Sequence, residues 1–137
     1  MYSQEKIDNL IKEMAGVRDV KPGDDLMNDL GVTGDDFHEL IAAYAKRFKV
    51  DMTTYLWYFH AEEEGALTSI GRSFFKPPYQ RVKHISVTPA LLLESANKGR
   101  WEIQYPPHKL PRRRWDIIID QVFFVVVMAL VLYACLK

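Results

Sequence analysis

The sequence predicts a small, mainly α-helical domain followed by one C-terminal transmembrane helix. Two segments, residues 4–15 and 34–48, repeat apolar side chains with the period of an α-helix. A third segment, residues 89–98, lies between a helix-capping threonine and a helix-ending glycine. Finally, residues 117–136 form an almost uninterrupted apolar run of 20 residues, long enough to cross a bilayer.

The first helix is expected to begin after Ser3 and to end at Gly16, residues that suit the two ends of a helix. Its apolar side chains are three and four positions apart and therefore share one face; they are Ile7, Leu10, Ile11 and Met14. The connection that follows, residues 17–34, is unusually long for a small domain.

The second helix is expected to start near Gly34 or Asp35 and to end at Phe48. Its predicted core face consists of Phe37, Leu40, Ile41, Tyr44 and Phe48. Asp35, Asp36 and Glu39 fall in its first turns, where the helix dipole favours negative charge.

The aromatic cluster at residues 55–59 predicts a short helix or turn that fills the core. Residues 65–85 look irregular, and we expect short strands near 70–75 and 81–87. The last helix of the domain has Thr88 as its cap, Pro89 in its first position and Gly99 at its end. We expect Trp101, just beyond it, to fold back onto the domain.

These elements divide the chain into a helical domain (1–104), a Pro/Arg-rich spacer (105–114) and an anchor (115–137). Within 117–136 the strongly polar residues are Asp120 and Gln121, which leaves an interfacial helix as an alternative to a span. Arg112, Arg113 and Arg114 precede the anchor and predict a cytoplasmic N-terminal domain, and Trp115 suits the headgroup layer.

Charge is distributed unevenly along the chain. Residues 1–70 carry 7 Lys/Arg against 14 Asp/Glu, and residues 71–137 carry 11 against 4. The acidic half predicts docking of a basic protein partner, and the basic half lies where it would meet anionic lipid. Nucleic-acid binding is not expected, because membrane topology already explains the arginines. The single cysteine, Cys135, excludes a disulfide within the chain.

Residues 29–51 resemble an acyl carrier protein. The matching positions are Asp29, Leu30, Gly31, Asp36, Glu39, Leu40, Phe48, Val50 and Asp51. In this register Gly34 stands where the family carries its phosphopantetheine-bearing serine, and Thr33 replaces the acid before it. Because glycine has no side chain to esterify, the resemblance implies a helical carrier fold without its prosthetic group, and no cofactor is expected.

A longer stretch, roughly residues 5–101, resembles a bacterial acyl-carrier-like family of unknown function, domain of unknown function 1493. The residues that carry this resemblance are Gly34, Asp35, Asp36, Tyr58, Phe59, Glu62, Gly99, Arg100 and Trp101. The resemblance implies a small helical bundle from a Gram-negative bacterium and no established activity.

We therefore expect a non-catalytic, membrane-tethered interaction module in the bacterial inner membrane, docking its partner through Asp35, Asp36 and Glu39. The alternative is a membrane-associated group carrier or lipid-metabolism accessory with an unrecognised attachment residue. No enzyme is expected, since no catalytic constellation is present. No metal site is expected either, because His60 and the glutamates after it match no zinc spacing.

Overall fold

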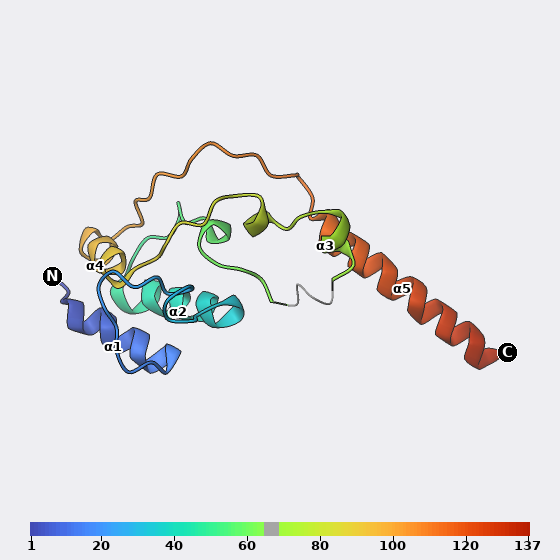
Figure 1. The fold of residues 1–137 in the computed structure, drawn as a ribbon, viewed down its shortest axis with the longest axis horizontal. Coiled ribbons are helices and arrows are strands. Elements are labelled where there is room, and N and C mark those ends of the chain that lie inside the picture. Colours follow the sequence, from blue (N-terminus) through green and yellow to red (C-terminus); the bar gives the residue numbers. More distant parts are fainter. Residues whose placement is uncertain (65–68) are drawn as a thin grey trace.

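The computed structural model describes residues 1–64 and 69–137 and is mainly helical (Figure 1). Its elements are α1 (Gln4–Ala15), α2 (Gly34–Phe48), η1 (Trp57–Phe59), α3 (Gly71–Phe74), η3 (Pro78–Gln80), α4 (Pro89–Lys98) and α5 (Trp115–Leu136), where η marks a 3₁₀ turn. Helices α1, α2 and α4 gather at one end of the molecule, and α5 projects from the other. Helix α3 lies beside the first turns of α5.

The three longer helices of the domain match the sequence prediction closely. Helix α1 ends at Gly16, which has a left-handed backbone (φ 68°). Thr88 caps α4 by accepting a hydrogen bond from the Leu91 amide, and Pro89 occupies its first turn. The core faces are confirmed as well, except that Met14 of α1 is 38% exposed.

The core lies where α1 packs against α2 and α4. Buried side chains from these helices are joined by Trp101, which is 2% exposed, so the prediction that it folds back is confirmed. The Tyr44 hydroxyl donates to the Leu92 carbonyl at 2.6 Å. This bond ties α2 to α4 inside the core and satisfies a buried hydroxyl.

The long connection between α1 and α2 is fixed to the rest of the domain. Leu26 is fully buried, and its amide donates to the Val87 carbonyl at 2.9 Å. The Asp25 carboxylate accepts hydrogen bonds from His84 Nε2 (2.7 Å) and Ser86 Oγ (3.1 Å). Burial acts to raise the pKa of Asp25, but the hydrogen bond from His84 and the bonds beside it outweigh burial and hold that pKa below its usual value.

The expected short strands are wrong, because no strand forms among the described residues. Residues 70–75 contain α3. The β-type pairing in the described part of the chain is one isolated bridge between Asp51 and Arg100. Within residues 81–87 the backbone bonds to separate segments, the Ile85 amide to the Phe59 carbonyl and the Val87 carbonyl to the Leu26 amide, so no ladder develops. The expectation that residues 65–85 are irregular includes 65–68, which lie outside the described residues.

Candidate interaction site

The acidic start of α2 is presented to solvent. Asp35, Asp36 and Glu39 are all exposed, and within the described ranges none of them forms an ion pair. Their helix neighbours Phe37 and Leu40 are fully buried, which fixes the face of α2 on which the carboxylates lie. The three carboxylates therefore add to one exposed negative surface.

Gly34, the first residue of α2, is buried and has a left-handed backbone with φ 57°. A β-carbon added there would lie 2.3 Å from Cγ of Glu64 and 2.5 Å from its Oε1. The backbone angle therefore disfavours any residue with a β-carbon at this position, and such a residue would also require the exposed Glu64 side chain to move.

A groove of about 510 Å³ opens beside this helix start. It is lined by Gly34, Asp35, His38, Trp57, Glu63, Glu64 and Arg114. The His38 and Trp57 rings meet edge to face, with centroids 5.6 Å apart. The groove thus combines carboxylates with an aromatic wall, a surface suited to a basic side chain.

Arg114, one of the predicted topology arginines, is half-buried and is held by two carboxylates. Its Nε and Nη2 reach the two carboxylate oxygens of Asp116 at 3.0 and 2.6 Å, and Nη2 lies 2.9 Å from Glu63 Oε1. Glu63 also pairs with Arg72 at 3.3 Å. This junction network connects the groove, α3 and the start of α5, and Asp116 within it is only 2% exposed.

The other topology residues remain on the surface. Arg112 and Arg113 are exposed, and the Arg113 guanidinium lies over the Trp115 ring at 6.0 Å. Trp115 is 42% exposed and its ring centroid is 6.3 Å from that of Phe75.

Helix α3 packs on the backbone of α5 through a glycine. The Asp120 carboxylate accepts hydrogen bonds from Ser69 Oγ at 2.6 Å and from the Gly71 amide at 2.7 Å. A β-carbon at Gly71 would lie 1.8 Å from the Asp116 carbonyl oxygen, so only glycine permits this approach. The sequence analysis did not predict this junction. Asp116 and Asp120 were a signal for it, because acids four residues apart lie on one face of an otherwise apolar helix and need partners there.

His60 is a fully buried structural residue. Its Nδ1 lies 2.8 Å from the Ile85 carbonyl, which can only accept, so Nδ1 carries the ring proton. Nε2 then accepts from the Tyr105 hydroxyl at 2.8 Å, and that oxygen in turn accepts from Trp101 Nε1 (2.8 Å) and the Leu56 amide (3.2 Å). Desolvation lowers the pKa of His60 to about 4, so it is neutral at pH 7.

His84 and His108 also have hydrogen-bond partners that the sequence did not reveal. His84 bonds to Asp25, and His108 Nε2 lies 2.7 Å from the Tyr58 hydroxyl. Across residues 1–64 and 69–137 no three His, Cys, Asp or Glu side chains are grouped so that they could hold a metal ion.

Fold and site together define a helical domain with an exposed acidic helix start, joined to a helix of 22 residues in which an 18-residue window has a mean hydropathy of 2.5. That helix is long and apolar enough to cross a membrane. The family described as Protein of unknown function (DUF1493) matches residues 2–104, and the chain belongs to this family. No curated protein and no solved structure matches it.

Proposed function

We propose that the protein is a non-catalytic interaction module, tethered to the bacterial inner membrane by α5 with its domain in the cytoplasm. It docks a protein partner that carries a basic patch, and it does so through Asp35, Asp36 and Glu39. The observation that carries the proposal is the exposure of these three carboxylates, free of described ion pairs, with Asp35 among them lining the groove. Complementary charge of this kind favours fast and specific association.

The proposal includes a degenerate acyl-carrier-like fold, one that keeps the acidic docking helix and lacks the attachment serine. Gly34 supports this part, because it has no side chain to modify and its positive φ disfavours a residue with a β-carbon at the attachment position. A carrier function would need a different attachment residue. The membrane tether is supported by the length and hydropathy of α5 and by its exposure from Gln121 onwards.

The test is purification of the tagged full chain from detergent-solubilised native membranes, alongside a variant with Asp35, Asp36 and Glu39 changed to lysine. A matched variant carries the same three changes to lysine at exposed acids that have no described contact with α2: Glu5, Asp19 and Glu94. We expect a partner to accompany the wild type and the matched variant, to be lost from the α2 variant, and to dissociate as salt is raised.

The proposal fails if all three preparations retain the same proteins or if none retains any. The intact mass of the wild-type preparation provides a second criterion. A mass increase equal to a phosphopantetheine arm would establish the group-carrier alternative instead.

A further inference from the structure

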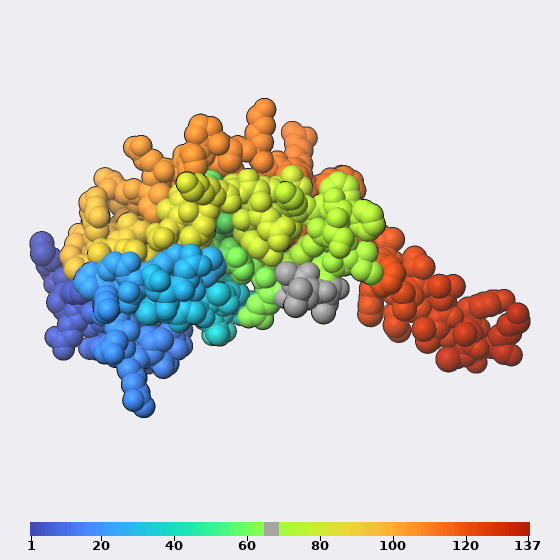
Figure 2. All heavy atoms as spheres, viewed as in Figure 1, coloured from blue at the N-terminus to red at the C-terminus, as the bar shows by residue number. Residues whose placement is uncertain are grey.

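Exposed apolar side chains of the domain concentrate beside the start of α5. Outside α5, the large apolar residues exposed in the described ranges are Met1 and Met14 near the N-terminus, and Ile70, Phe74 and Phe75 in or next to α3. Phe74 is 72% exposed. Figure 2 shows α3 at the base of α5, where that helix leaves the body of the molecule. Exposed phenylalanines beside an apolar helix suit the boundary between lipid headgroups and acyl chains.

The hydrogen bonds to Asp120 fix the depth of α3 along α5. At about 1.5 Å per residue, Asp120 lies roughly 6 Å beyond Asp116 along the helix. The residues after it, 121–136, span only about 24 Å, which is shorter than the ~30 Å hydrocarbon layer of a bilayer. If α5 crosses the bilayer, Asp120 therefore lies within that layer, near its edge. A bare carboxylate is costly at that depth, but Ser69 and Gly71 donate to it. Helix α3 must therefore accompany Asp120 to the membrane boundary.

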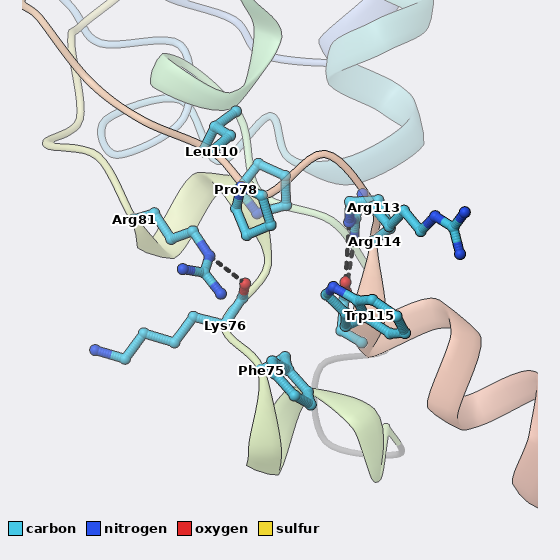
Figure 3. A pocket seen from close by; sticks show the side chains of 10 residues that line it. Phe75, Lys76, Pro78, Arg81, Leu110, Arg113, Arg114 and Trp115 are labelled. Carbon is cyan, nitrogen blue, oxygen red and sulfur yellow. Dashed lines mark hydrogen bonds and ion pairs between the residues drawn. The ribbon is translucent and has the colours of Figure 1, made fainter.

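Cations surround this apolar patch. A cleft of about 100 Å³ lies between α3 and the entry to α5. Figure 3 shows Phe75 and Trp115 on one side of it and Arg81 on another. Arg81 donates through Nε to the Lys76 carbonyl at 2.7 Å. The Lys76 and Arg113 side chains extend outward from the cleft. In the part of the chain that the structure describes, Lys76, Arg81 and Arg113 have no acidic partner, in contrast to Arg114.

We propose that α3 is a second membrane-contacting element, in which Phe74 and Phe75 enter the headgroup layer of an anionic phospholipid bilayer while Lys76 and Arg113 bind lipid phosphates. The proposal rests on the membrane tether of the proposed function. The occupant is a bilayer because the patch is continuous with α5, and an anionic one because the surrounding charge is positive. Two contacts, α5 and α3, hold the domain in one orientation on the membrane.

The test uses the full chain in a Cys135→Ser background, with single cysteines at Phe74, at Met14 or at Val126, each labelled with an environment-sensitive fluorophore. The protein is reconstituted in vesicles of phosphatidylcholine and phosphatidylglycerol, with nitroxide quenchers on the lipid. Met14 is the matched control, because it is an exposed apolar residue on α1, far from α5 (Figure 1). Val126 reports on α5 itself.

We expect loss of fluorescence at positions 74 and 126 and none at 14. Quenching at 126 without quenching at 74 overturns the role of α3 and leaves the tether intact. Absence of quenching at 126 overturns the tether first, and the present inference with it.

The lipid preference is tested by placing the nitroxide on phosphatidylglycerol or on phosphatidylcholine. We expect the probe at position 74 to be quenched more by the anionic lipid. This preference is expected to disappear with Lys76→Gln and Arg113→Gln together, and to persist with Lys6→Gln and Lys83→Gln, which remove the same charge from exposed sites elsewhere. Equal quenching by both lipids in the wild type overturns phosphate binding by this patch.

Discussion

Removing one oxygen atom, in Tyr105→Phe, tests how the chain after α4 is attached to the domain. The Tyr105 hydroxyl accepts from Trp101 Nε1 and from the Leu56 amide, and it donates to His60 Nε2. It therefore uses its single donor and both of its lone pairs, and it joins three segments of the chain. Burial also raises the pKa of Tyr105, so the hydroxyl stays protonated.

The expected cost follows from counting these bonds. The phenylalanine ring keeps the packing, with Phe59 as a neighbour at a centroid distance of 4.7 Å, so the loss is confined to three hydrogen bonds. At ~1 kcal/mol for each, the free energy of unfolding should fall by about 3 kcal/mol. That is a large part of the stability of a small domain.

The measurement is chemical denaturation of the full chain in mild detergent, followed by far-ultraviolet circular dichroism. Tyr58→Phe is the matched control, since its hydroxyl has a single bond, to the exposed His108. We expect that control to lose less than about 1 kcal/mol. If Tyr105→Phe costs no more than Tyr58→Phe, the network around His60 does not hold residue 105 to the domain.

Two further perturbations follow from the buried groups. Desolvation lowers the pKa of His60 from 6.5 to about 4, so the native state binds a proton at this histidine only at a lower pH than the unfolded state does. The contribution of His60 to the free energy of unfolding is therefore fully present above pH 6.5. It should fall by about 3 kcal/mol as the pH is lowered to 4. Denaturation midpoints across that range measure this loss, and a flat profile would contradict a neutral, buried His60. Gly71→Ala forces a β-carbon against the Asp116 carbonyl and should cost ~1–3 kcal/mol and expose the Gly71 amide to hydrogen exchange. Gly23→Ala is its control, with open space around the added carbon, and equal behaviour of the two variants would refute the close packing of α3 on α5.

Prediction from sequence succeeded where the signal is local. The bounds of α2 and α4 follow from periodicity, a capping threonine and a terminal glycine, all within one element. The exposure of Asp35, Asp36 and Glu39 follows from the same periodicity, since the buried stripe of α2 leaves them on the outside.

Prediction failed where the partners are distant in the chain. His60 and Tyr105 are 45 residues apart, and Asp25 and His84 are 59 apart, so neither pairing leaves a trace in the local pattern. The strand expected at residues 70–75 failed for a related reason. Ser69 and the Gly71 amide bond to Asp120, about 50 positions further along, and that contact overrides local β propensity.

The two acids at the start of α5, Asp116 and Asp120, attach this apolar helix to the rest of the protein. A carboxylate in an apolar helix is unfavourable unless it is paired, and both are: Asp116 with Arg114, and Asp120 with Ser69 and Gly71. Arg114 continues the junction network to Glu63, which also lines the groove beside α2. The groove and α5 therefore share one set of ion pairs. These ion pairs would restrict the direction of a partner docked at the acidic start of α2 relative to α5, whereas a free spacer over residues 105–114 would have left that direction undefined.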